Sequence, residues 1–197
     1  IAVPTAIKVY NWVLTLWKGN IHLNVPMLFA IGFIFTFIHG GLTGLFLGNV
    51  TVDLPLSDTY FVVGHFHMVM GVSPILVVFG AIYHWYPKIS GRMWNERLGK
   101  AHFWLTFLGT YAIYLPMHYL GILGVPRRYY ALGDTAFIPD SVHSINAAIT
   151  IAALIVAAAQ VIFLYNMIVS LKKGAKAPPN PWKATTLEWQ TPDTPPH

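Results

Sequence analysis

The chain has 197 residues, of which 55% are hydrophobic and only 10% are charged. A soluble domain carries about a quarter charged residues, so this composition and a mean hydropathy of +0.56 exclude an ordinary soluble globular fold. The net charge of +5 alone would also suit nucleic-acid binding, but the basic residues lie between long apolar runs, as in membrane proteins. The absence of cysteine excludes disulfides, thiolate zinc sites, cysteine-held iron–sulfur clusters and c-type haem attachment, which leaves nine histidines as candidate metal ligands.

The apolar segments, in chain order, predict an all-α membrane protein with four full transmembrane helices and one partial helix. A span needs about 20 apolar residues to cross the hydrocarbon core. Four segments without Asp, Glu, Lys or Arg reach that length: 26–47, 59–87, 101–123 and 141–171. A fifth, 1–17, is interrupted by Lys8 and opens on Ile1 without a methionine or the basic start of a signal peptide. We therefore interpret the chain as the C-terminal piece of a longer protein.

Charges in the loops predict which helix ends face the cytoplasm. One set of loops carries nine basic residues, whereas the opposite set carries only Arg127 and Arg128 beside four aspartates. The positive-inside rule places the nine-residue side in the cytoplasm. That side includes segment 172–197, which has six prolines from residue 177 onward. We expect it to be an extended, poorly ordered cytoplasmic tail.

In the first predicted helix, Lys8 follows Thr5 by about one helical turn. The lysine either extends its long stem to the cytoplasmic surface or belongs to a buried proton path with the Thr5 hydroxyl as a relay. The residues alone leave both alternatives open.

The second and third predicted helices contain features that shape packing. Gly40, Gly41, Gly44 and Gly48 form two overlapping patterns of small residues four apart. These favour close packing of another helix over the approach of a flat macrocycle. Pro74 removes a backbone hydrogen bond from the third helix, so we expect a kink there.

The third predicted helix opens with a run from Asp58 to His67 that holds two histidines, His65 and His67. On an α-helix, positions i and i+2 lie about 200° apart, so these imidazoles project to opposite faces. They cannot comfortably bind the same metal ion, but they can ligate two cofactors, one on each side, with Phe66 between them. Neutral imidazole is a good axial ligand for haem iron. The alternative is hydrogen bonding to neighbouring helices, and the pairing in one run favours ligands.

After the fourth predicted helix, Arg127 and Arg128 lie side by side in the outer loop. Two guanidiniums on the side poor in basic residues favour fixed anionic partners such as haem propionates, since the arginine fork binds carboxylates in a bidentate manner. A solvated surface pair is the alternative. For His102 and His118 in the helix before them, structural hydrogen bonds are favoured over a second haem or metal site. We assign no chemistry to the histidines near helix ends, His22, His39, His84 and His143.

These residues make the chain resemble subunit I of the haem-copper terminal oxidases, in particular the aa3-type cytochrome c oxidases. The resemblance covers nearly the whole chain and is sharpest at residues 58–67, 40–44 and 126–129. Residues 67–71 and 180–182 have a bacterial rather than an animal mitochondrial style. The resemblance implies that the chain forms the last part of a twelve-helix bundle, namely part of the eighth helix and all of the ninth to twelfth.

The resemblance also implies roles for individual residues. His65 would be the proximal ligand of the high-spin haem a3, where oxygen binds, and His67 an axial ligand of the low-spin haem a. Phe66 would lie between the two haems. Arg127 and Arg128 would pair with haem propionates.

Thr5 and Lys8 would lie on the proton-uptake route called the K path, which favours a functional Lys8. The family usually has His-Asp before Thr-Tyr, and both residues help to form a magnesium or manganese site. Here Ser57 replaces the histidine while Asp58 remains, so the site would be weakened, bridged by water or absent. The ligands of copper B would lie before Ile1, and this chain would supply only one face of the oxygen site.

The implied function is reduction of O2 to water with electrons from cytochrome c, coupled to proton translocation across a bacterial inner membrane. The implied partners are the N-terminal half of subunit I, subunits II and III, cytochrome c and the lipid bilayer, without nucleic acid. The sequence leaves open the type of haem (A, B or O) and the electron donor (cytochrome c or quinol). Three alternatives remain: a nitric oxide reductase of the same superfamily, a non-catalytic dihaem electron carrier, and a cofactor-free proton-coupled transporter.

Overall fold

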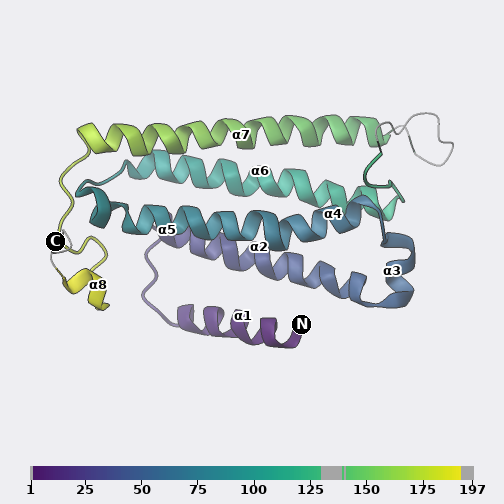
Figure 1. Cartoon of the computed structure of the whole chain (residues 1–197), viewed down its shortest axis with the longest axis horizontal. Coiled ribbons are helices and arrows are strands. Elements are labelled where there is room, and N and C mark those ends of the chain that lie inside the picture. The colour runs from purple at the N-terminus through teal and green to yellow at the C-terminus, as the bar shows by residue number, and fades with distance from the viewer. Residues whose placement is uncertain (1, 130–138, 140, 192–197) are drawn as a thin grey trace.

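The computed structural model describes residues 2–129, 139 and 141–191, and these form helices without a β-strand. The all-α prediction is therefore confirmed for this part of the chain. Long helices lie side by side, and two short ones lie near the bundle's ends (Figure 1). In chain order the elements are α1 (Ala2–Leu16), α2 (Val25–Gly48), α3 (Val50–Leu56), α4 (Tyr60–Phe66), the π-helix η1 (His67–Val72), α5 (Ser73–Ser90), α6 (Glu96–Ile122), α7 (Ser141–Lys173) and α8 (Leu187–Gln190).

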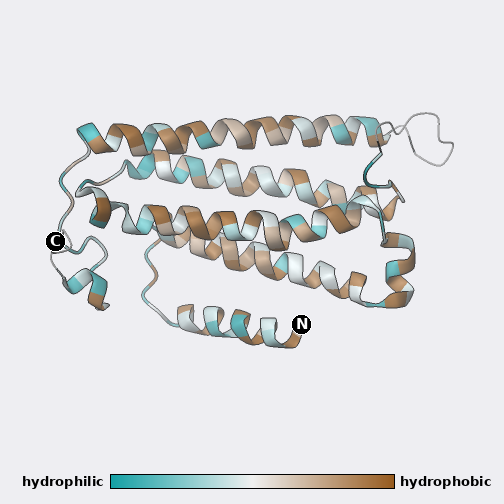
Figure 2. Ribbon diagram, in the orientation of Figure 1, coloured by the Kyte–Doolittle hydropathy of each residue, from teal (hydrophilic) through white to brown (hydrophobic). Residues whose placement is uncertain are grey.

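Among the described residues, three helical segments are long and apolar enough to cross a membrane: Val25–Gly48, Tyr60–Ser90 and Ser141–Lys173. The predicted fourth span corresponds to α6, which has 27 residues and begins before its apolar run. Its start is set by Asn95, whose side chain accepts hydrogen bonds from the backbone N–H groups of Arg97 and Leu98. Hydrophobic residues recur along the long helices (Figure 2), and many large apolar side chains on them are exposed, as expected for helices that face lipid or further protein.

The helices pack in two linked sets. α6 packs against α7 and α4, and α2 packs against α5 and η1. α1 packs against α2, where Trp12 contacts the rings of Phe33 and Phe37 at centroid distances of 4.8 and 5.6 Å. The arrangement leaves α4 and η1, which carry the paired histidines, between α2 and α6.

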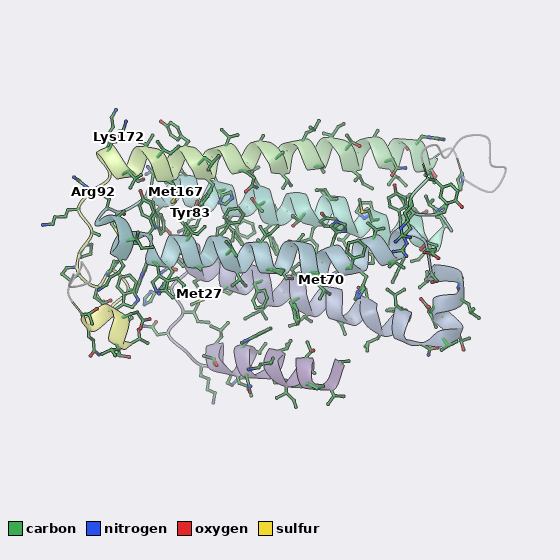
Figure 3. The ribbon with its side chains drawn as sticks, viewed as in Figure 1. Met27, Met70, Tyr83, Arg92, Met167 and Lys172 are labelled. Carbon is green, nitrogen blue, oxygen red and sulfur yellow. The ribbon has the colours of Figure 1, made fainter. Side chains whose placement is uncertain are left out.

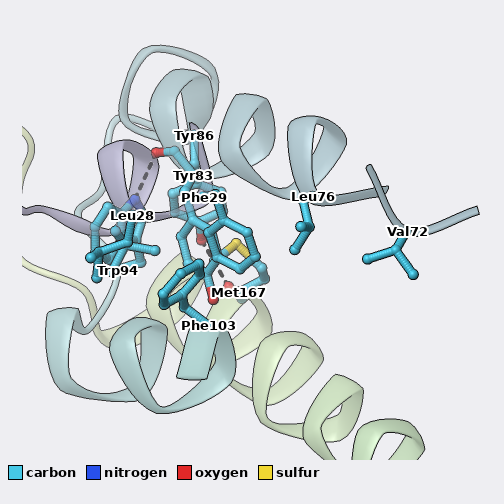
Figure 4. Packing of buried hydrophobic residues seen from close by; sticks show 10 residues of the cluster. Leu28, Phe29, Val72, Leu76, Tyr83, Tyr86, Trp94, Phe103 and Met167 are labelled. Carbon is cyan, nitrogen blue, oxygen red and sulfur yellow. Dashed lines mark hydrogen bonds between the residues drawn. The ribbon is translucent and has the colours of Figure 1, made fainter. Parts of the chain in front are cut away.

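An aromatic core fills the bundle near the loop between α5 and α6 (Figure 4). Phe29 lies 5.0 Å from Phe103 and 5.7 Å from Tyr83, measured between ring centroids. The indole N–H of Trp94 donates to the Tyr83 carbonyl at 2.9 Å. These contacts join α2, α5 and α6 at the end that the charge pattern predicts to be cytoplasmic.

Basic residues gather at that same end. Figure 3 shows Arg92 and Lys172 there, and the Arg92 guanidinium donates to the Gly174 carbonyl at 3.0 Å. The loop with Arg127 lies at the opposite end of α6. For the described residues, the two sets of loops distinguished by charge are therefore at opposite ends of the bundle; Asp134 and Asp140 lie outside the described residues.

The proline content of the segment after α7 predicted an extended, poorly ordered tail. That prediction is wrong for the described residues up to 191, which pack against the bundle. Trp189 is 3% exposed, and its indole N–H donates to His84 Nε2 at 3.2 Å. The indole of Trp182 donates to the His84 carbonyl at 3.0 Å and stacks on the imidazole. Two tryptophans thus attach residues up to 191 to α5, which a count of prolines does not reveal.

The irregularity expected at Pro74 lies just before it. η1 occupies the turn from His67 to Val72, and the Ser73 hydroxyl donates to the Met68 carbonyl at 2.6 Å. A π-helical turn is a known way for a helix to accommodate a proline, since the wider ring reassigns the hydrogen bonds that the proline removes. The segment Tyr60–Ser90 therefore continues past Pro74 with a wide turn that begins at His67.

Candidate functional site

His65 faces α2, where the backbone comes very close. Its Nδ1 lies 2.9 Å from the Gly40 carbonyl oxygen and 3.1 Å from the Thr43 hydroxyl. A Cβ atom on Gly44 would lie only 2.7 Å from His65 Cε1, so glycine is what lets the ring sit there. Because a carbonyl can only accept, Nδ1 carries the proton, and a neutral His65 has its lone pair on Nε2.

His67 faces the other side of the helix, toward α6. Its Nδ1 donates to the Val63 carbonyl at 2.9 Å, and its ring stacks on Tyr114 with centroids 5.0 Å apart and planes 16° apart. Phe66 lies between the two histidines in sequence, and its ring centroid is 4.4 Å from that of His67. The two imidazoles thus contact different helices, as the spacing of two residues predicted.

Both histidines have the geometry of oriented metal ligands. A backbone carbonyl fixes each ring through Nδ1, and a ligating histidine commonly uses this second hydrogen bond to set its tautomer and orientation. Within the described ranges, no three His, Asp or Glu side chains gather around a point where a metal ion could bind. What each imidazole offers a cofactor is a single nitrogen, Nε2.

The predicted anion-binding loop is held against the start of α4. The backbone N–H of Tyr60 donates to the Val125 carbonyl at 3.0 Å, and that of Arg127 donates to the Asp58 carbonyl at 2.9 Å. The Arg127 guanidinium also donates from Nε and Nη2 to Asp58 Oδ1, at 3.0 and 2.7 Å. Arg128 is exposed and has a positive φ of 69°. Two residues predicted to have different partners, a propionate for Arg127 and a metal for Asp58, here bind each other.

The structure does not bring Thr5 and Lys8 to the paired histidines. Both lie on α1, which packs against α2, with Thr5 half-buried and Lys8 exposed.

Several residues of the site have no strong signal in the sequence. The Gly40 carbonyl and the Thr43 hydroxyl reach His65 across 25 and 22 positions, and Tyr114 reaches His67 across 47. The glycine pattern was predicted to permit close helix packing, and Gly44 does so here. The signal that could have pointed to Thr43 and Tyr114 is a hydroxyl or aromatic residue on another predicted helix at the same membrane depth as the paired histidines.

His102 is the structural histidine that the sequence favoured. It is fully buried, with Nδ1 3.2 Å from the Tyr83 hydroxyl and Nε2 3.1 Å from Gln160 Oε1. Both ring nitrogens have partners, which confirms the prediction of structural hydrogen bonds for this residue.

A model of the family described as "Cytochrome C and Quinol oxidase polypeptide I" matches residues 1–155. The "Alternative cytochrome c oxidase subunit 1" of Bradyrhizobium diazoefficiens is 72% identical over 196 residues, and the match covers 100% of this chain and 33% of that protein. The "Cytochrome c oxidase subunit 1" of Synechocystis sp. is 50% identical over 195 residues, covering 99% of this chain and 34% of that protein. The chain spans about a third of the length of these curated relatives.

The fold has a counterpart among solved structures. A cryo-EM structure of a heme-copper terminal oxidase dimer matches with a TM-score of 0.66, over 89% of this chain and 34% of that one. The sequence identity is 18%, so this match concerns the fold alone.

Proposed function

Because the chain belongs to the cytochrome c and quinol oxidase polypeptide I family, we propose that it supplies one axial histidine to each of the two haems of a terminal oxidase. The observation that carries the proposal is that His65 and His67 are oriented by the same kind of hydrogen bond. Each donates Nδ1–H to a backbone carbonyl, and the two rings face different helices. This leaves two Nε2 lone pairs directed to opposite sides of one helix.

In the proposed assignment, His65 ligates the iron of the high-spin haem a3 and His67 that of the low-spin haem a. The haems supply electron transfer and the reduction of O2 to water with electrons from cytochrome c. Only Phe66 lies between the two histidines in the sequence, so the end of α4 and the start of η1 hold both. Gly40, Thr43 and Tyr114 are positioning residues, because they orient the imidazoles through contacts with the rings.

Arg127 and Arg128 are proposed to neutralise the haem propionates. The family role requires Arg127 to exchange or share its contact with Asp58, which is 77% exposed at its side chain. Shared binding is chemically reasonable because a guanidinium has five N–H donors and Asp58 accepts two of them. The described residues supply only Asp58 toward a magnesium or manganese ion, which is short of a complete site, so we derive no step through such a metal.

Thr5 and Lys8 are proposed to move protons toward the oxygen site along the K path. One helical turn separates them on α1, so a hydroxyl and an ammonium lie on similar faces. The remaining machinery is proposed to come from partners: the N-terminal half of subunit I with the copper B ligands, and subunits II and III. The proposed setting is a bacterial inner membrane with the C-terminus in the cytoplasm, which the clustering of basic loops supports.

The test is a reduced optical spectrum of the intact membrane complex with and without carbon monoxide. We expect two haems, of which one shifts with CO and is lost in His65→Ala, while His67→Ala loses the haem that does not shift. His22→Ala, which changes an exposed loop histidine, is the matched control and should leave both haems. A complex without a CO-reactive haem would favour the electron carrier. Retention of both haems in His65→Ala would refute the ligand assignment.

A further inference from the structure

Three polar atoms are buried between α2 and α6 without a hydrogen-bond partner among the described residues. They are Thr36 Oγ1, Tyr111 OH and His118 Nε2. Thr36 is 0% exposed and His118 is 7% exposed. A buried polar group without a partner costs about 1–3 kcal/mol, so three such atoms in one region require an explanation.

The three atoms belong to one cluster arranged around His39. The His39 ring centroid lies 5.6 Å from that of Tyr111 and 6.0 Å from that of His118. Thr36 is close enough to Tyr111 to act on its hydroxyl, and neither hydroxyl is otherwise satisfied by a hydrogen bond among the described residues. Two neighbouring buried hydroxyls without a partner can be bridged by water.

The hydrogen-bond donors and acceptors of the cluster indicate which kind of ligand it can bind. His118 Nδ1 donates to the Tyr114 carbonyl at 2.7 Å, so a neutral His118 has an acceptor at Nε2 and needs a donor there. Thr36 and Tyr111 each can donate and accept. None of these groups is a carboxylate, so the cluster offers a cation no compensating charge. Because the three atoms are buried, a ligand that reaches them has to be small.

We propose that Thr36, His39, Tyr111 and His118 bind internal water, which donates to His118 Nε2 and bridges the hydroxyls of Thr36 and Tyr111. A buried water commonly makes about three hydrogen bonds to groups that would otherwise lack partners. The cluster supplies acceptors and donors from two helices, and the water joins them.

The water site adjoins both backbone segments that hold His65. His39 immediately precedes Gly40, whose carbonyl accepts from His65 Nδ1. The His118 ring lies against Gly64, where a Cβ atom would come within 2.8 Å of His118 Nδ1. Bound water therefore fixes side chains on either side of the proximal histidine, which gives it a positioning role at the proposed haem site.

The first experiment is a cryo-EM map of the intact oxidase at a resolution that shows ordered water. We expect isolated density within hydrogen-bonding distance of His118 Nε2 and a second contact with Thr36 or Tyr111. An empty site, or direct bonds among the side chains, would overturn the proposal. A metal ion, detected as metal in excess of the haem irons and copper, would overturn it as well.

The second experiment is a double-mutant cycle in the intact oxidase, read as the temperature at which haem is lost. If water bridges the two hydroxyls, Thr36→Val and Tyr111→Phe each lower this temperature, and the double variant lowers it by less than their sum. Additive effects would contradict a shared water. Thr110→Val is the control for Thr36, because the Thr110 hydroxyl is bonded to the Phe107 carbonyl of its own helix, and Tyr119→Phe is the exposed control for Tyr111.

Discussion

Two regions of this chain differ in how they hydrogen-bond the ring nitrogens of their histidines. In the aromatic core, His102 has a side-chain partner at each ring nitrogen. Between α2 and α6, the rings of His65, His67 and His118 are each fixed through Nδ1 by a backbone carbonyl, and no hydrogen bond to Nε2 is found among the described residues. All four are intramembrane histidines by sequence. What separates them is whether the second nitrogen is already used, because only a free lone pair can bind a ligand.

The largest effect is expected where the backbone approaches His65. In Gly44→Ala, the new methyl group would lie 2.7 Å from Cε1 of the ring, so the imidazole has to leave its place beside Gly40. We expect loss of most of the CO-reactive absorbance of the intact oxidase. Gly41→Ala is the matched control on the same helix, since a Cβ there meets open space. Equal spectra for both variants would contradict the close approach.

The aromatic core should respond in stability rather than in haem content. His102→Leu leaves the Tyr83 hydroxyl and Gln160 Oε1 without their imidazole partner, at a cost of about 2–4 kcal/mol. The measurement is thermal denaturation of the intact complex together with its reduced spectrum. We expect a lower midpoint and two unchanged haems. A lost haem would show that His102 belongs with the ligand histidines.

A smaller, local effect is expected in the segment after α7. Trp189→Ala removes a buried indole and its bond to His84, which costs up to about 3 kcal/mol. Because each 1.4 kcal/mol changes a population about tenfold, the segment should open far more often. Trypsin should then cleave after the exposed Lys183 faster than in the parent. Leu187→Ala, at a position 75% exposed, should leave the cleavage rate unchanged.

The smallest effect is expected at the exposed ion pair. Asp58→Asn removes the charge that Arg127 binds, and exposed pairs contribute less than about 1 kcal/mol. The difference in thermal midpoint from the parent should be slight at low salt and should vanish at high salt. A large loss of stability that persists at high salt would show that this pair is shielded from solvent in the assembled complex.

Much of the architecture follows from local sequence properties. Apolar length predicts the spans, and the spacing of His65 and His67 predicts that they face different neighbours. Both depend only on the period of a helix, which is the same in any context. The tail was predicted less well, because its order comes from Trp182 and Trp189 meeting a helix about a hundred residues earlier.

The parts of the site that the sequence does not reveal are long-range contacts. Thr43 and Tyr114 become positioning residues only because α2 and α6 flank α4. The pairing of Arg127 with Asp58 likewise joins residues 69 apart. The sequence assigned no chemistry to His39 and favoured structural hydrogen bonds for His118, since the partnerless Nε2 of His118 is visible only after helix packing is known.

The wide turn at η1 has a consequence for how this helix tolerates changes of length. A π-helical turn holds about one residue more than an α-helical turn. Removing one residue from His67–Val72, such as the exposed Met70, would convert the turn to regular α-helix without shifting the faces of the flanking segments. The same deletion in α6 would rotate everything beyond it by about 100°. Among the residues that the structure describes, the stretch next to the paired histidines is thus the one π-helical turn where a single-residue deletion preserves the register of a long helix.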